Sequence, residues 1–168
     1  MFIVKSYVLK PEKIHSDLSG LTNNPNDFFI EISEINNKIS KSLHFRPLEG
    51  AIKIQYGKEI LLDLIHWDFV NGLWHSLLNL VENIQSNGEG LAYFPDSALE
   101  IHLTKKHNDV MLYSLIGSKT YKTTTLPKKE FLNALLDGAE YFFKTLMKYE
   151  PEYKYGLERA KELRAKLK

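Results

Sequence analysis

The residues best suited to chemistry are concentrated in one short stretch, HWDFVNGLWH, at positions 66–75. It holds both tryptophans, an aspartate and two of the six histidines. A site of His66, Asp68 and His75 at a strand-to-helix junction could bind a metal ion or an anion. Helical rise, however, places His75 about 10 Å beyond Asp68, too far for both to ligate one metal. We therefore expect Asp68 to be the helix N-cap and the two histidines to lie on the surface.

Glu100 and His102 form a second candidate pair. They alternate along a predicted strand, so they share the face opposite its apolar side chains and lie within reach of each other. General acid–base chemistry would also need a nucleophile or an orienting group, and the sequence around the pair supplies neither. The sequence therefore favours a polar strand face. The other histidines fall in predicted loops without metal-ligand spacing: His15, His44 and His107.

Established motifs give no further chemistry. The chain has no glycine-rich phosphate loop, no H-E-x-x-H and no G-x-S-x-G. It also has no cysteine, which excludes disulfides, thiolate catalysis and cysteine-ligated zinc. We accordingly predict no catalytic residue, no metal site and no cofactor.

The charge balance restricts the partners. Basic and acidic residues number 22 and 21, and only three of the basic residues are arginines, the preferred readers of phosphates and guanine edges. Nucleic acid is therefore not an expected partner. No apolar run approaches the roughly 18 residues of a membrane span, and the first residues lack the pattern of a signal peptide. The sequence predicts a cytoplasmic protein that does not act in a membrane.

Three tyrosines around Pro151 are the predicted partner-binding residues: Tyr149, Tyr153 and Tyr155. Tyrosine beside charged residues is typical of protein interfaces, because it gives a large contact area at low entropic cost. The alternative, which the sequence favours, is that these tyrosines dock the last helix onto the body, since that helix has only a narrow apolar stripe.

The hairpins have predictable registers. In residues 51–65, a three-residue loop would pair Ile54 with Leu62 and Tyr56 with Ile60, giving one apolar face. In the next hairpin, a four-residue connection at 105–108 would pair Leu103 with Val110. This second register leaves Tyr113 on the open face that carries the acid–base pair. Further strands are predicted at 2–9, 28–33, 91–94, 98–104, 110–116 and 119–125.

Two amphipathic helices are predicted near 69–85 and 128–148, and the SNGEG stretch at 86–90 ends the first. A charged helix follows over 151–168. The segment 34–49 has no clean period and is predicted to be loop or a short helix. The length and the 43% hydrophobic content suit a single globular domain over 1–168.

These elements predict an α+β fold: a largely antiparallel sheet of six or seven strands, two main helices on one face and a charged C-terminal helix. The expected function is non-catalytic protein binding. Small bacterial immunity proteins, which neutralise a toxin by covering it, share this general profile, and the lysine, isoleucine and asparagine content fits an AT-rich bacterial genome. A small enzyme with a His/carboxylate site and a homo-oligomeric structural or regulatory protein remain alternatives.

Overall fold

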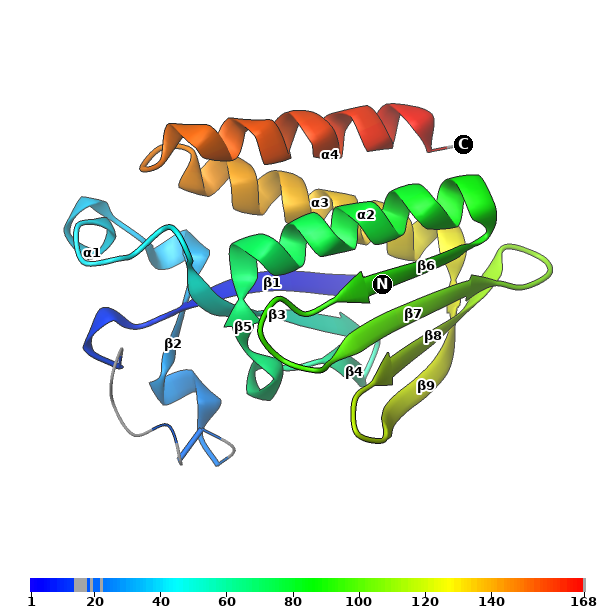
Figure 1. The fold of residues 1–168 in the computed structure, drawn as a ribbon, viewed down its shortest axis with the longest axis horizontal. Coiled ribbons are helices and arrows are strands. Elements are labelled where there is room, and N and C mark those ends of the chain that lie inside the picture. Colours follow the sequence, from blue (N-terminus) through cyan, green and yellow to red (C-terminus); the bar gives the residue numbers. More distant parts are fainter. Residues whose placement is uncertain (14–17, 19, 22, 168) are drawn as a thin grey trace.

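The computed structural model describes residues 1–13, 18, 20–21 and 23–167 of the chain. Within these residues, nine strands form two antiparallel sheets, and the long helices lie above them as a layer in Figure 1. The expected α+β fold, largely antiparallel and with a charged C-terminal helix, is confirmed. The strands divide between two sheets, however, whereas the sequence predicts a single one.

The first sheet has the order β2-β1-β3-β4, and β5 pairs with the start of β3. Its strands are β1 (Phe2–Leu9), β2 (Phe29–Glu31), β3 (Glu49–Tyr56), β4 (Glu59–Leu62) and β5 (Asp68–Phe69). The second sheet is the predicted antiparallel meander, in the order β6-β7-β8-β9. Its strands are β6 (Glu89–Tyr93), β7 (Glu100–Lys105), β8 (Val110–Ile116) and β9 (Thr120–Pro127).

The two sheets meet where β4 lies beside the second sheet. The Tyr113 hydroxyl donates to the carbonyl of Leu61 at 2.9 Å, and the Lys122 ammonium donates to the carbonyl of Ile60 at 3.0 Å. Carbonyls of the edge strand β4 are thus paired with side chains instead of a neighbouring strand. The chain satisfies these polar groups without joining the sheets into one ladder.

The β3–β4 register is only partly as predicted. Ile54 pairs with Leu62, as expected, but Tyr56 pairs with Glu59 and not with Ile60. A bulge between these pairs shifts the register by one residue. The loop is therefore a two-residue turn, and its first residue, Gly57, adopts a positive φ of 56°.

The predicted β7–β8 register is wrong. Leu103 pairs with Tyr113 instead of Val110, because the turn lies further along the chain: Lys106 bonds to Val110 across it, and both Asn108 and Asp109 adopt positive φ. The register is thereby shifted by three residues, and a shift by an odd number exchanges the two faces of β8. Tyr113 consequently lies in the core, fully buried, and not on the open face.

The predicted helices are present. They are α2 (Val70–Asn87), α3 (Lys128–Leu146) and α4 (Lys154–Lys166), and a short α1 (Asn37–Ser40) lies in the segment without clean period. Helix α2 ends at Gly88, whose φ of 79° is the left-handed cap that the SNGEG stretch predicts. Short 3-10 turns complete the chain: η1 (Pro11–Lys13), η2 (Pro25–Asp27), η3 (Ile32–Glu34), η4 (Leu64–His66) and η5 (Pro151–Tyr153).

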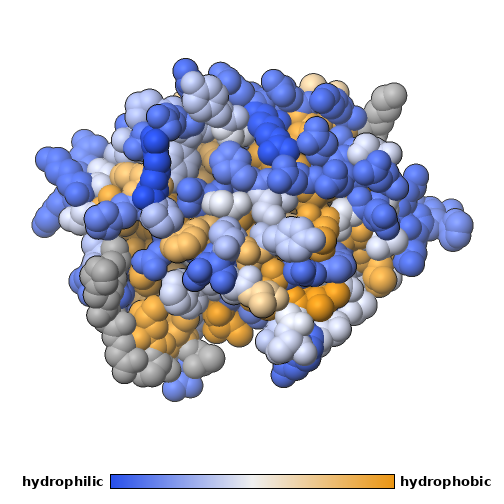
Figure 2. All heavy atoms as spheres, in the orientation of Figure 1, coloured by the Kyte–Doolittle hydropathy of each residue, from blue (hydrophilic) through white to orange (hydrophobic). Residues whose placement is uncertain are grey.

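The core lies between the helices and the sheets. Trp74 of α2 and Phe142 of α3 are fully buried, with ring centroids 6.0 Å apart. The Trp74 indole nitrogen donates to the Ser6 hydroxyl at 2.9 Å, which fixes α2 over β1. Helix α4 packs outside this layer, against α3 and α2 (Figure 1), and the residues at this side of the molecule are mostly hydrophilic (Figure 2).

Candidate functional site

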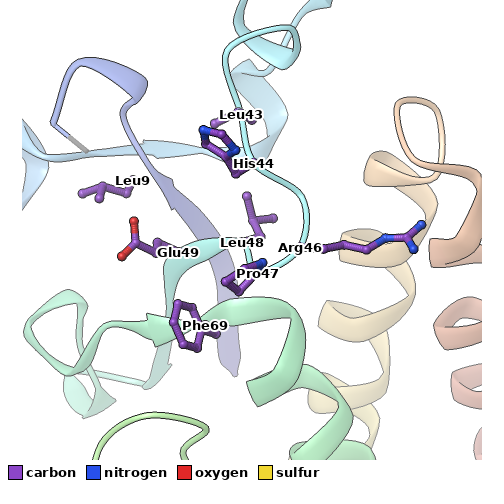
Figure 3. A pocket seen from close by; sticks show the side chains of 8 residues that line it. All are labelled: Leu9, Leu43, His44, Arg46, Pro47, Leu48, Glu49 and Phe69. Carbon is purple, nitrogen blue, oxygen red and sulfur yellow. The ribbon is translucent and has the colours of Figure 1, made fainter. Parts of the chain in front are cut away.

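An apolar pocket lies where the loop after α1 meets the start of α2 (Figure 3). We call it the Arg46 pocket. Its volume is about 410 Å³, within the range of small-molecule sites and of sockets for a partner's side chain. It is lined by Leu9, Leu43, His44, Arg46, Pro47, Leu48, Glu49 and Phe69.

The pocket wall is held by hydrogen bonds to the start of α2. The Val70 amide donates to the Leu48 carbonyl at 2.8 Å, and the Leu48 amide donates to the side chain of Asn71 at 3.1 Å. Leu48 is itself buried. An otherwise irregular loop is thereby fixed against a long helix, so the pocket is largely preformed.

Arg46 joins this loop to the C-terminal part of the chain. Its guanidinium donates to the Glu150 carboxylate at 2.6 Å and lies 2.6 Å from the Glu152 carboxylate. The hydrogen bond to Glu150 is the main reason that the pKa of Arg46 is raised. Figure 3 shows the Arg46 side chain pointing away from the other lining residues, toward the helices at the C-terminal end.

The three predicted partner-binding tyrosines differ in exposure. Tyr153 is buried and donates to the Phe45 carbonyl at 2.8 Å, and half-buried Tyr149 donates to the Ile35 carbonyl at 3.0 Å. Burial raises the pKa of Tyr153 above its usual range. These two tyrosines dock the C-terminal helix, as the alternative interpretation has it. Tyr155, 61% exposed, is the tyrosine of the three that is available to a partner.

The hypothesis that His66, Asp68 and His75 form one metal- or anion-binding site finds no support in the geometry. His66 packs edge-on against Tyr121, with ring centroids 5.9 Å apart. His75 instead packs on Phe143 and lines a small cavity of about 130 Å³ beside Arg46. The two histidines thus belong to different surroundings, and burial lowers the pKa of each.

Asp68 is not the helix cap, and that prediction is wrong. The N-cap position of α2 is Phe69, and Asp68 is a buried β5 residue that is 4% exposed. Its carboxylate accepts from the amides of Phe69 at 2.6 Å, Asp96 at 3.0 Å and Ser97 at 2.9 Å. Asp68 therefore fixes the loop between β6 and β7 to the start of α2.

The predicted proximity of Glu100 and His102 is confirmed. Their side chains are in contact at 2.7 Å between Nε2 and Oε2, with 36% and 42% of the side-chain surface exposed. His102 also lines a polar pocket of about 390 Å³ with Asn83, Asn87 and Thr104. Ser114 lies opposite His102 on β8, but its hydroxyl bonds to Thr123. The pair is an exposed contact on the sheet surface.

Among the residues that the structure describes, no three His, Cys, Asp or Glu side chains gather as a metal-ligand set. His15 lies outside those residues. A helix long and apolar enough to cross the bilayer is likewise missing from the described part of the chain.

The Arg46 pocket is not predictable from the sequence pattern, because the loop that forms it has no periodicity. The feature of the sequence that could have indicated this region is its arginines, since the chain has only three: Arg46, Arg159 and Arg164. Each forms an ion pair between the body of the protein and residues 149–167, which we call the C-terminal element. Arginine suits paired contacts with carboxylates, so the few arginines of this chain indicate where such ion pairs form.

Comparison of the chain with models of protein families, with curated proteins and with solved structures finds no match.

Proposed function

We propose that this chain is a non-catalytic, cytoplasmic protein-binding module whose partner inserts an apolar side chain into the Arg46 pocket. The observation that carries the proposal is the composition of the pocket. Leucines, a proline and Phe69 make up most of its lining, and the polar residues His44, Arg46 and Glu49 complete it. An apolar centre with a polar rim is the anatomy of protein interfaces, and a fixed pocket suits a hot-spot residue.

The C-terminal element adds to this surface. Glu152, joined to Arg46, is exposed, and so is Tyr155 on the same element. Arginine and tyrosine are enriched at interfaces, because both offer contact area together with hydrogen-bond donors. Arg46 therefore joins its pocket to the C-terminal element, which carries the tyrosines that the sequence predicts to bind a partner.

A narrower form of the proposal takes the partner to be a toxin that this chain neutralises, as bacterial immunity proteins do. Its support is the class-level analogy of a small α+β chain without cysteine. The balanced charge supports a protein partner over nucleic acid.

Photo-crosslinking in the native cell tests the proposal. A benzophenone amino acid at His44, which lines the pocket, should give a product of one discrete mass. The same amino acid at His107, in the β7–β8 turn, is the control and should give none. In the chain labelled at His44, the further substitution Leu43→Arg obstructs the pocket and should remove the product. The substitution Ser42→Arg, beside it, should not.

Equal products from His44 and His107 would contradict the proposal. A product of twice the chain's mass would support the homo-oligomeric alternative. The enzymatic alternative rests on the contact between Glu100 and His102. It would gain support from a turnover that His102→Ala abolishes and Leu43→Arg leaves intact.

A further inference from the structure

One edge of β1 leaves part of its backbone unpaired. In an antiparallel ladder, successive residues direct their N–H and C=O groups alternately to the two sides. The amide of Gly57 donates to the carbonyl of Met1 at 3.1 Å, so odd-numbered residues of β1 bond to β3. Phe2 and Val4 therefore direct their backbone groups to the other side, away from β3.

The hydrogen bond between β1 and the residue before β2 shows the same alternation of backbone groups. The amide of Lys10 donates to the carbonyl of Phe28 at 2.9 Å, so even-numbered residues of β1 face β2. Strand β2 pairs only with Tyr7, Val8 and Leu9. Among the described residues, no strand pairs with the stretch 2–5 of β1 on this side.

A groove follows this unpaired edge. Its volume is about 370 Å³, and it is lined by four consecutive residues of β1, Phe2, Ile3, Val4 and Lys5, and by Ala134, Asp137, Gly138 and Tyr141 of α3. The α3 residues have the spacing of one helix face. Ile3 and Tyr141 at the groove are 38% and 51% exposed. We call this the β1–α3 groove.

We propose that the β1–α3 groove binds an extended peptide segment of another protein, which adds to the sheet as a strand beside β1. The unpaired groups of Phe2 and Val4 supply the main-chain hydrogen bonds, and α3 forms the wall that receives alternate side chains. A sheet edge beside a helix is a recurring mode of peptide recognition, and it satisfies an edge that would otherwise be open to aggregation.

A second copy of this chain does not fit the groove. Helix α3 packs on β1 itself, with Gly138 against Val4. Adjacent strands lie about 4.8 Å apart, whereas packed helices need about 8–10 Å, so two copies joined at this edge would bring their α3 helices into collision. The eight lining residues are also far fewer than the roughly 20–30 per partner of a stable dimer.

Charge defines the peptide further. Lys5 and Lys53 lie directly opposite each other on the outer face of the sheet. Lys5 also forms an ion pair with Glu31 at 2.9 Å, so one of the two like charges is already balanced, and an acidic residue added beside Lys5 is favoured by the positive charge of Lys53. On the other face, the peptide meets Ala134 and the tyrosine ring of α3, which suit an apolar side chain, while the carboxylate of Asp137 in the same lining is ion-paired with Arg164. The expected segment alternates apolar and acidic residues.

The β1–α3 groove is separate from the Arg46 pocket. Leu9, at the other end of β1, lines that pocket, and no residue is shared by the two linings. A variant at one site therefore tests that site alone.

Amide hydrogen exchange measured by NMR tests the proposal. In the free protein, the amide of Val4 should exchange at least about tenfold faster than those of Ile3 and Lys5, which bond to β3. The probe is a heptapeptide of alternating valine and glutamate at about 1 mM. It should slow exchange at Val4 and leave the amide of Phe69, in the Arg46 pocket, unchanged.

Two control peptides separate the interactions. The same peptide with alternate backbone nitrogens methylated should not protect Val4, because it lacks the donors, and a valine–lysine version should bind at least about fivefold more weakly. In the protein, Ala134→Gln should reduce binding at least about tenfold, whereas Glu130→Gln, on an exposed position of α3 outside the groove, should not. Slow exchange of Val4 in the free protein, or no protection by the valine–glutamate peptide, would overturn the proposal.

Discussion

The hydroxyl of Tyr113, on β8, donates to the carbonyl of Leu61, on β4, at 2.9 Å, and both residues are buried. This hydrogen bond crosses from one sheet to the other. Tyr113→Phe keeps the ring but leaves a buried carbonyl without its donor, so the free energy of unfolding should fall by about 1–3 kcal/mol. Chemical denaturation checks this value. An unchanged midpoint would mean that the bond does not contribute to holding the sheets together.

The same tyrosine gives a prediction at high pH. Burial raises the pKa of Tyr113 well above its ordinary value of 10.0. The neutral form therefore stabilises the fold below pH 10, and this stability should be lost as the pH rises from about 10 toward the pKa of the folded state. Tyr113→Phe should unfold less steeply with pH in that window than the wild-type chain does. Urea midpoints between pH 9 and 11 would show the difference.

Asp68→Ala should lower the free energy of unfolding by roughly 3 kcal/mol, more than the about 1 kcal/mol of a lost helix cap. The reason is that the buried carboxylate accepts from the amides of Phe69, Asp96 and Ser97. Asp68→Asn retains one acceptor oxygen and should lose less. Faster amide exchange at Asp96 and Ser97 in Asp68→Ala would confirm the local cause, and equal stability of both variants would contradict it.

Helix α3 offers a matched pair of substitutions. Phe142 is fully buried against Trp74 and Phe143, whereas Lys144 is exposed. Phe142→Ala should cost about 3–5 kcal/mol, and Lys144→Ala should stay within about 0.5 kcal/mol. Thermal or urea denaturation distinguishes them. Similar midpoints would place the wrong face of α3 in the core.

The histidine beside the C-terminal element should make stability fall in mild acid. Partial burial is the main cause that lowers the pKa of His75 below its ordinary value of 6.5, and the charge of Arg159 adds to it. The unfolded chain thus takes up a proton first, so stability is present above pH 6.5 and lost as the pH falls through the folded-state pKa. His75→Gln should flatten this dependence, which urea midpoints measured across that pH range would show.

The tyrosines of the C-terminal element should separate stability from binding. Tyr153→Ala removes a buried ring and its bond to Phe45, and it should cost about 3 kcal/mol. Tyr155→Ala should stay within about 0.5 kcal/mol of wild type, because the ring is mostly exposed. Only Tyr155→Ala, once circular dichroism has shown that it is folded, reports on a partner. Unchanged crosslinking from His44 in that variant would remove Tyr155 from the proposed surface.

The sequence by itself determined the elements and the class of fold. Strand β1 occupies the predicted residues 2–9, and α3 presents the predicted apolar stripe, because hydrophobic periodicity is a local property. The glycine at position 88 ends α2 as predicted, since a left-handed cap is also local. The mutual reach of Glu100 and His102 follows in the same way from strand alternation.

The tertiary structure alone decided how the turns, sheets and sites are arranged. The β7–β8 turn lies further along the chain than predicted, and this local difference moved Tyr113 from an expected surface into the core, because an odd register shift exchanges the faces of a strand. Asp68 found its partners 28 and 29 residues away, which no cap pattern contains. The Arg46 pocket and the β1–α3 groove both join segments far apart in the chain. Contacts of that kind depend on packing and loop geometry, which periodicity does not encode.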